Sequence, residues 1–374
     1  MGLRVRSLGA GVNALPDPSF WRGRRVLLTG HTGFKGAWLT CWLRELGAEV
    51  LGVSLPEPPT SPSLWEQLDR DDIDEIRVDI TRPGWSVGVA EFRPEVVIHL
   101  AAQSLVPVGH SDPAGTFNAN VGGTVAVMAL LADLPEVVAT LIITTDKVYD
   151  PRQQPPHDES HFLGGLEPYS ASKAAAELAV LSWPATRAPR ATARAGNVIG
   201  GGDWAADRLL PDLVRAWQAS EVPHLRAPAS VRPWQHVLEP LRGYLVQVEA
   251  LAAGREVPPA LNLGPADGQA VSVEELALFA AGWWQSATAQ LTGARFTKAT
   301  APAFHETVNL TLDSRLAAKT LGWTSALDWR EAVALTLEWY VGFARGRRAD
   351  ELVAAQLAAY TSHVQNGTTT KESS

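Results

Sequence analysis

Short strand-like runs alternate with stretches of helical spacing through the first half of the chain. The runs lie at residues 25–29, 50–55, about 76–78, 96–100, 141–144 and 191–194, and each is too short for a stable helix. Apolar residues recur with helical spacing at 37–46, at 117–131 and in the stretch after Tyr169. This alternation predicts an α/β fold, a doubly wound parallel sheet with helices on both faces.

The rhythm changes after Gly200, where glycine, proline and tryptophan become frequent. This region predicts a smaller mixed α/β lobe over the carboxyl ends of the parallel strands, where open α/β sheets bind ligands. We therefore expect one domain from residues 21–195 with about 235–265, and a second lobe from about 196–234 with 266–350. Residues 1–20 are interpreted as an N-terminal extension and residues 363–374 as a polar tail.

Composition narrows the classes of function. The net charge of −8 argues against a nucleic-acid-binding protein, which normally carries a basic face. Cys41 is the single cysteine, which excludes an internal disulfide and a site of several cysteines, and we expect no metal centre. No apolar run approaches the roughly 20 residues that span a bilayer, and no signal peptide is indicated. We therefore expect a cytoplasmic protein.

The first strand-like run leads into the segment TGHTGFKG, residues 29–36. Its three glycines allow a tight turn and a close approach to a ligand, while the following helix N-terminus offers free N–H groups to a pyrophosphate. Glycine spacing alone also fits a plain tight turn, but the strand before it and the helix after it favour a Rossmann-type dinucleotide site. The candidate cofactor contacts in this loop are Gly30, His31, Gly33, Phe34, Lys35 and Gly36.

The second strand lacks the acidic residue that usually stands at its end. Ser54 and Leu55 occupy this place, and Glu57 follows in a proline-rich loop. Because an acid there normally binds the ribose hydroxyls and selects NAD over NADP, its absence leaves that choice open on physical grounds. His31 and Lys35 could reach a phosphate, or they could be ordinary solvated loop residues.

Further cofactor contacts are expected at the ends of the third and fourth strands. Asp79 and Ile80 follow the third strand and could receive the adenine. Ala101, Ala102 and Gln103 follow the fourth, where small side chains would let the backbone approach the cofactor. Ordinary core packing would also explain the two alanines.

Tyr169 and Lys173 lie four residues apart, which places both on one face of a helix. A nearby ammonium favours the phenolate and lowers the tyrosine pKa from its usual value of about 10. The pair could then take a proton from a substrate hydroxyl while hydride leaves for a nicotinamide, so both residues are catalytic and cofactor-binding candidates. The same spacing occurs by chance in many helices, and the glycine loop upstream favours the functional interpretation.

The second catalytic candidate is the segment TTDKVY at the end of the fifth strand-like run. Thr145, Asp146 and Lys147 would lie at the carboxyl edge of the sheet, where this architecture places its active sites. Asp146 and Lys147 are adjacent ionisable groups of opposite sign, so one could donate a proton while the other accepts one.

These motifs together resemble the extended short-chain dehydrogenases that act on nucleotide sugars. The loop GHTGFKG and the segments RAGNVIGGGDW (194–204) and VRPWQHV (231–237) are similar to the branch of CDP-glucose 4,6-dehydratases. The resemblance covers roughly residues 19–345. It implies a Rossmann-type fold and NAD as the cofactor.

The resemblance implies a redox-neutral dehydration of CDP-glucose to CDP-4-keto-6-deoxyglucose. Tyr169 would deprotonate the 4-hydroxyl as NAD takes hydride from C4, water would leave from C5 and C6, and hydride would return to C6. Asp146 would protonate the departing 6-hydroxyl, and Thr145 would bind the 4-oxygen. Lys147 stands where most sugar 4,6-dehydratases carry a glutamate and would serve as the base or as the partner of one. A lysine base must be neutral, which requires a lowered pKa.

The same resemblance supplies the substrate contacts. Asn197, Arg208 and Arg232 are candidates for the nucleotide and its diphosphate, since guanidinium groups suit phosphate oxygens. His236 belongs either to this site or to the interior. The chain departs from the family after Gln103, where Pro107 and His110 replace an arginine and a tyrosine. This departure leaves a different nucleotide sugar open as the substrate.

Two other functions stay open. A nucleotide-sugar 4-epimerase would need Tyr169 and Lys173 but no acid–base pair for elimination. A dinucleotide-binding regulator without catalysis would normally have lost one of these two residues, and both are present. The resemblance also implies a homodimer or tetramer, to which the apolar helix at residues 117–131 would contribute.

Overall fold

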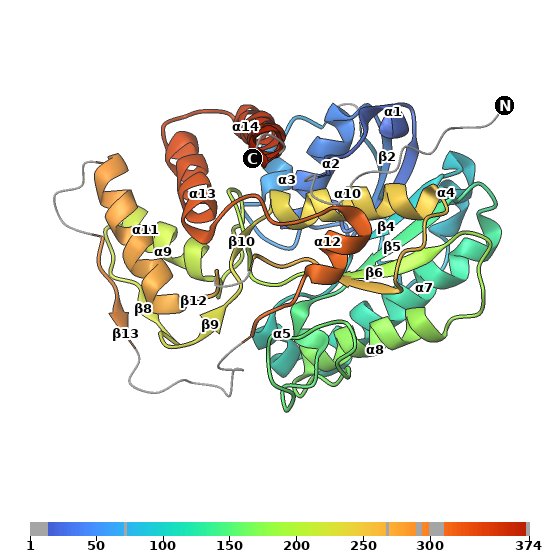
Figure 1. The fold of residues 1–374 in the computed structure, drawn as a ribbon, viewed down its shortest axis with the longest axis horizontal. Helices are drawn as coiled ribbons and strands as arrows, with labels where there is room; N and C mark the ends of the chain where they lie inside the picture. The colour runs from blue at the N-terminus through green and yellow to red at the C-terminus, as the bar shows by residue number, and fades with distance from the viewer. Residues whose placement is uncertain (1–13, 71–72, 267–268, 289–293, 299–309, 372–374) are drawn as a thin grey trace.

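A seven-stranded parallel sheet forms the centre of the larger part of the molecule, on the right in Figure 1. The computed structural model describes residues 14–70, 73–266, 269–288, 294–298 and 310–371. The strand order is β11-β6-β5-β4-β1-β2-β3, and every neighbouring pair is parallel. The strands are β1 Arg25–Thr29, β2 Glu49–Ser54, β3 Asp74–Arg77, β4 Val96–His99, β5 Ala139–Ile143, β6 Arg190–Arg194 and β11 Ala260–Asn262.

The α/β prediction is therefore confirmed, and the six predicted strands lie within about two residues of the observed ones. The apolar pattern does not predict β11, because a three-residue strand has no measurable period. The chain runs from β1 outward to β2 and β3, then returns to β4 on the other side of β1. Such a reversal of strand order opens a crevice at the carboxyl edge, where doubly wound sheets bind their ligands.

Alternating residues of the strands face two separate cores. In β1, Val26 and Leu28 belong to one core and Leu27 to the other, as the period of two in a strand requires. The first core includes helices α2 Phe34–Glu45 and α10 Leu238–Ala252, and the second includes α4 Ser86–Phe92, α7 Gly123–Leu130 and α8 Pro168–Ser182 (Figure 1). Both faces of the sheet are thus covered.

The helix predicted at residues 117–131 begins earlier and is not a regular α-helix throughout. It comprises α6 Pro113–Phe117, a π-helical turn at Asn118–Gly122, α7, and a 3₁₀ turn at Leu131–Asp133. Among the described residues, the helical stretch Pro113–Asp133 is long and apolar enough to cross a membrane, by length and composition only. The expectation that no apolar run approaches 20 residues is therefore wrong. Val127, Met128 and Leu130 of this stretch pack into the second core, and 39% of its apolar window is buried.

A smaller lobe of helices and two-stranded ladders lies beside the sheet, on the left in Figure 1. Its helices are α9 Leu209–Gln218, α11 Val273–Thr288 and α13 Trp329–Ala344. Its ladders pair β7 Val198–Ile199 with β10 Gln235–His236, β9 Val231–Arg232 with β12 Val271–Ser272, and β8 His224–Leu225 with β13 Thr297–Lys298. The other described helices are α1 Pro18–Trp21, α3 Leu64–Gln67, α5 Val106–Ser111, α12 Arg315–Leu321 and α14 Ala349–Lys371.

Helix α14 is held to α10 by a buried polar network. Arg242 on α10 donates from Nε to the Tyr360 hydroxyl of α14 at 2.8 Å, and that hydroxyl donates to Glu239 Oε2 at 2.9 Å. Glu239 Oε1 accepts the backbone N–H groups of Ala326 and Leu327. The helix continues into residues beyond 363, the region whose composition predicts a polar tail.

We predict that Tyr360→Phe lowers the stability of the protein by about 1–3 kcal/mol, because it leaves the buried Nε of Arg242 without a partner and Glu239 Oε2 with Arg242 Nη2 alone. The change is read from the midpoint of thermal or urea unfolding. The control is Thr361→Ala, which removes a hydroxyl that bonds only to the backbone of α14. An equal loss in the two variants would contradict the prediction.

Candidate active site

The glycine loop lies where β1 meets α2, beside the loop that follows β4. Gly30 has a φ of +77°, and a Cβ there would come within 2.6 Å of the Ala101 nitrogen. A Cβ on Gly36 would come within 2.1 Å of the Gly30 oxygen. Gly33 is the N-cap of α2, and its helix N-terminus has no side-chain cap. The backbone therefore forms a cradle with free N–H groups, which fits the pyrophosphate of a dinucleotide.

The other predicted cofactor residues have different surroundings. Asp79 accepts from the Thr81 backbone at 2.9 Å in the turn after β3, while Ile80 is buried in the second core. Ala101 donates its N–H to Thr29 Oγ1 at 3.2 Å, and Ala102 is exposed beside it. Phe34 is half-buried and would touch a Cβ built on Gly200.

Gln103 is not free to turn toward a ligand, because both ends of its amide are engaged. Its Nε2 donates to Thr116 Oγ1 at 2.8 Å, and its Oε1 accepts from the Leu105 backbone at 2.5 Å. Its backbone is bound on both sides by Asn120, which comes from the π-helical turn. Gln103 therefore shapes the loop after β4, and the backbone of Leu100 and Ala101 in that loop lies against the glycine loop.

His31 is not a solvated loop residue, since its side chain is completely buried. Its Nδ1 lies 3.0 Å from Ser54 Oγ, and its Nε2 lies 3.3 Å from Glu75 Oε2. Burial lowers the pKa of His31, and the Glu75 carboxylate opposes that effect. The imidazole thus points toward β2 and β3. His31 is neither the phosphate contact nor the solvated residue that the sequence left open.

Lys35 reaches across to α10 and the catalytic candidates. Its Nζ lies 3.2 Å from the Tyr244 hydroxyl. Burial lowers the pKa of Lys35 to about 7, and the charges of Lys173 and Arg208 lower it further, while Asp146 acts in the opposite direction. Lys35 therefore lies half-buried between the glycine loop and the candidate catalytic residues.

Tyr169, Thr145 and Asp146 form one hydrogen-bonded cluster at the carboxyl edge of the sheet. Thr145 Oγ1 donates to Asp146 Oδ1 at 3.0 Å, and Thr145 shares a hydrogen bond with the Tyr169 hydroxyl. Tyr169 is the second residue of α8, whose N-cap Glu167 accepts the Tyr169 backbone N–H at 2.8 Å. The two sequence motifs, more than 20 residues apart in the chain, thus meet at one point.

Lys173 lies one helical turn from Tyr169 and is buried, with Nζ donating to the Ile143 carbonyl at 2.7 Å. Burial lowers the pKa of Lys173 to about 8, while the charge of Glu177 raises it. Burial raises the pKa of Tyr169 to about 12, opposed by Thr145 and Arg208. The expected lowering of the tyrosine pKa by Lys173 is therefore not found, because desolvation dominates and the ammonium is directed to the Ile143 carbonyl.

Asp146 is the most constrained residue of the cluster. Its side chain is 1 % exposed, and its Oδ2 has no hydrogen-bond partner among the described residues. A Cβ on Gly196 would come within 1.6 Å of that oxygen, so only glycine leaves room for the carboxylate. Burial raises the pKa of Asp146, and Lys147 is the largest opposing influence. Lys147 is half-buried beside it.

The candidate substrate residues divide into three near the cluster and one beneath it. Arg208 donates to Asp203 Oδ2 at 3.0 Å and to Ser104 Oγ at 3.3 Å, and Arg232 is buried close enough to lower the pKa of Asp146. Asn197 follows β6 with a left-handed φ of 44°. His236 is fully buried, and burial lowers its pKa to about 3. Its ring lies edge-on to Trp38 of α2, which supports the interior position for His236.

Sequence reasoning missed the residues that hold this cluster in place. Glu177 accepts from Thr144 Oγ1 at 2.8 Å and pairs with Arg194, whose Nη1 donates to the Tyr149 hydroxyl at 2.6 Å. Asn120 donates from Nδ2 to Ser172 Oγ at 2.8 Å, which links the loop after β4 to α8. The position of Glu177, four residues after Lys173, was the one available signal, since the two share a helix face.

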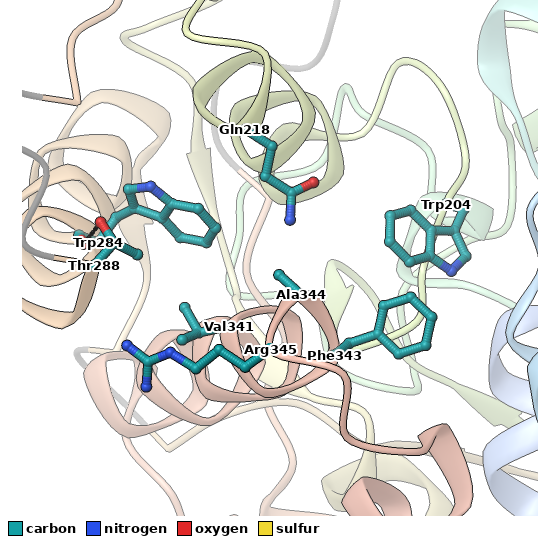
Figure 2. A pocket seen from close by; sticks show the side chains of 8 residues that line it. All are labelled: Trp204, Gln218, Trp284, Thr288, Val341, Phe343, Ala344 and Arg345. Atoms are coloured by element: carbon teal, nitrogen blue, oxygen red, sulfur yellow. Dashed lines mark hydrogen bonds between the residues drawn. The ribbon is translucent and has the colours of Figure 1, made fainter.

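One hollow among the described residues lies apart from this cluster. It has a volume of about 550 Å³, and Figure 2 shows its lining side chains, which come from the smaller lobe: Trp204, Gln218, Trp284, Thr288, Val341, Phe343, Ala344 and Arg345. Trp204 also packs against Tyr340 with ring centres 5.3 Å apart. None of the catalytic candidates lines the hollow, so it carries no argument about the reaction.

The glycine cradle and the cluster above β5 define a dinucleotide-binding enzyme of the doubly wound α/β class. The sequence profile of the NAD dependent epimerase/dehydratase family matches residues 26–264, and the chain belongs to that family. NAD is accordingly its cofactor, and the cradle formed by Gly30, Gly33 and Gly36 fits it.

Individual relatives agree with this assignment. The chain is 39% identical to CDP-glucose 4,6-dehydratase of Salmonella typhimurium, over 88% of this chain and 94% of that protein. Among solved structures, the epimerase Mth375 of Methanothermobacter thermautotrophicus is similar with a TM-score of 0.74 and 22% identity, covering 90% of this chain and 96% of that one. The dTDP-glucose 4,6-dehydratase of Streptomyces venezuelae, solved with NAD, has a TM-score of 0.72 and 23% identity over 85% and 97%. These structural likenesses support the fold.

We predict that Gly36→Ala weakens NAD binding by about tenfold or more, because the Gly30 carbonyl must move and the cradle opens. Titration calorimetry measures the dissociation constant. The matched control is Gly282→Ala on α11, where a Cβ meets nothing within 4 Å. That variant should keep its NAD affinity and gain about 0.5–1 kcal/mol of stability. Unchanged NAD affinity in Gly36→Ala would exclude this cradle as the pyrophosphate site.

Proposed function

We propose that this protein dehydrates CDP-glucose to CDP-4-keto-6-deoxyglucose. The observation that carries the proposal is Asp146, a buried carboxyl with a raised pKa and an unpartnered oxygen beside Tyr169 and Lys147. The extensive similarity to a CDP-glucose 4,6-dehydratase supports the choice of substrate. Bound NAD supplies a reversible acceptor for hydride, so the reaction needs no outside oxidant.

Asp146 is suited to act as the acid for the departing 6-hydroxyl. Its raised pKa keeps more of the carboxyl protonated near neutral pH than an exposed aspartate would allow. Oδ1 is bound by Thr145, while Oδ2 remains available for a substrate oxygen. An epimerase has no departing hydroxyl and needs no such acid, so this residue favours dehydration over epimerisation.

Tyr169 is proposed as the base for the sugar 4-hydroxyl. Its pKa of about 12 must fall before it can take a proton, and two neighbours already act in that direction: the hydrogen bond with Thr145 and the charge of Arg208. Lys173 is proposed to hold the cofactor and add positive charge below the phenol. The Ile143 carbonyl fixes where that charge lies.

Lys147 is proposed as the base for the C5 proton, on the resemblance to the CDP-glucose branch. It is the middle residue of the 3₁₀ turn Asp146–Val148, with its backbone N–H 3.4 Å from Thr145 Oγ1. This turn places a cation beside the acid, so the two can act on adjacent sugar carbons. Lys147 must be neutral to accept a proton.

Arg208, Arg232 and Asn197 are proposed to bind the nucleotide and its diphosphate. We infer that residues 21–195 with about 235–265 hold NAD and that about 196–234 with 266–350 hold the nucleotide sugar. The segment that departs from the family forms α5, and a Cβ on Gly109 of this helix would come within 3.2 Å of the Tyr169 backbone nitrogen. Pro107 and His110 therefore belong to an element that packs directly on the base, which makes α5 the proposed site of sugar selection.

The proposal is tested by incubating the protein with NAD and CDP-glucose, UDP-glucose or dTDP-glucose in turn, and following product mass. We expect CDP-glucose alone to lose the mass of one water. Asp146→Asn should lower this rate about a hundredfold or more while CDP-glucose still binds, because an amide is not an acid. The control is Asp150→Asn, a carboxylate paired with Arg152 away from Tyr169. Conversion to an isomer of equal mass would instead establish an epimerase.

We also propose that the protein works in the cytoplasm as a homodimer or tetramer assembled through α7 and α8. Leu178 and Leu181 on α8 are 54% and 41% exposed. Phe117 at the end of α6 is 40% exposed, and α6 packs against α8. Apolar side chains gathered on adjacent helices are typical of an interface with another protein.

We predict that Leu178→Glu dissociates the assembly into monomers, because a charge in an apolar interface is desolvated without a partner. Light scattering coupled to size exclusion reads the mass. Leu278→Glu on α11 is the matched control, since Leu278 is equally exposed, at 57%, but lies in the smaller lobe. A monomeric wild-type protein, or dissociation by both variants alike, would refute the proposed interface.

A further inference from the structure

The end of β2 leaves the adenosine ribose without its usual acidic partner, and Ser54 does not replace it. The Ser54 hydroxyl is engaged in the glycine loop, lying 3.0 Å from His31 Nδ1 and accepting the Thr32 backbone N–H at 3.3 Å. Leu55 is exposed and apolar. The side chain that distinguishes a ribose 2′-hydroxyl from a 2′-phosphate must therefore come from another strand or loop.

Strand β3 brings two charged side chains to this place. It pairs with β2 in parallel register, with Glu75 opposite Gly52 and Arg77 opposite Ser54. Arg77 donates from Nη1 to the Leu55 carbonyl at 3.3 Å, so the guanidinium lies beside the end of β2. Its side chain is 27% exposed and thus open to a ligand.

Glu75 forms an ion pair with the Arg77 guanidinium. Its Oε2 forms an ion pair with Arg77 Nε and lies 3.3 Å from His31 Nε2. Gly52 makes the arrangement possible, because a Cβ there would come within 2.5 Å of the His31 ring. The carboxylate is therefore fixed on two sides, by the glycine loop and by the guanidinium.

An arginine beside the end of β2 is the ordinary device for binding the 2′-phosphate of NADP. Here Arg77 is already paired with the Glu75 carboxylate. A 2′-phosphate would either displace that carboxylate or be repelled by it at short range. A neutral 2′-hydroxyl neither has to displace Glu75 nor is repelled by its charge.

We propose that Glu75 sets the preference of this protein for NAD over NADP, by holding Arg77 in an ion pair beside the ribose and by repelling a 2′-phosphate. The role normally filled by an acid at the end of β2 thus passes to an acid on β3. The inference rests on the proposed function only in that the glycine loop must bind a dinucleotide.

The test compares dissociation constants for NAD⁺ and NADP⁺, measured by titration calorimetry on the full-length protein. Glu75→Gln keeps the size of the side chain and an acceptor toward His31, but removes the charge. We expect it to tighten NADP⁺ binding by about tenfold or more, as one newly available charge-assisted contact allows, with much less change for NAD⁺. The gain should fade as salt rises, because screening weakens the guanidinium–phosphate attraction.

Two further variants identify the cause. Glu75→Gln combined with Arg77→Gln should lose the gain for NADP⁺, since the guanidinium is what binds the phosphate. Arg77→Gln alone should weaken NADP⁺ binding below wild type, because Glu75 then repels the phosphate without compensation. Because the Arg77 side chain is partly exposed, this variant also keeps the test decisive if Glu75→Gln folds poorly. Glu57→Gln is the matched control: it removes an exposed acid in the loop after β2 and should change neither constant.

The outcomes separate this inference from the function. Unaltered NADP⁺ affinity in Glu75→Gln, with NAD⁺ still bound, would overturn the role of Glu75 and leave the dinucleotide site intact. A wild-type preference for NADP⁺, or a shift produced by Glu57→Gln instead, would overturn it as well. Failure of the wild-type protein to bind either dinucleotide would refute the proposed function and this inference with it.

Discussion

The contact of the glycine loop with the backbone after β4 is the constraint on which the site depends. Gly30 and Gly36 bring main chain against main chain, at distances that a Cβ would not allow. This contact fixes the start of α2 at the point where the strand order reverses. Helix α2 in turn positions the smaller lobe, because Trp38 Nε1 donates to the Gly201 carbonyl at 2.9 Å. The segment that carries Asp203 and Arg208 is thereby placed over the catalytic cluster.

Charge in the site is balanced between the surface of the crevice and the layer beneath it. Lys35 feels the positive charges of Lys173 and Arg208 and the opposing charge of Asp146, and burial lowers the pKa of both lysines. Below them, Glu177 and Arg194 form an ion pair that is almost completely buried. An unpaired charge at that depth would be strongly unfavourable. The Glu177 carboxylate of this pair raises the pKa of Lys173, while the hydrogen bonds of Glu177 and Arg194 stay satisfied.

The fold itself is shared with epimerases and dehydratases, so it does not decide the reaction. The proposed dehydration depends on a few side chains at the end of β5, above all on the protonation of Asp146. Because Gly196 has no side chain, it leaves the space in which the Asp146 carboxyl is buried. Oxidation at C4 would use the tyrosine and lysine, and elimination would use the residues that this space accommodates.

Local pattern in the sequence determined the strands, the glycine loop and the pairing of Tyr169 with Lys173, because each depends on spacings of a few residues. It placed the catalytic motifs at the carboxyl edge, since parallel strands share that edge. It could not give β11, the π-helical turn around Asn120, or the contacts of His31 with Ser54 and Glu75. Those contacts join segments 23 or more residues apart, and Asp146 meets Gly196 across a still longer stretch of chain. Burial and packing decide such contacts and the pKa shifts that follow from them, and neither is a property of neighbouring residues in the chain.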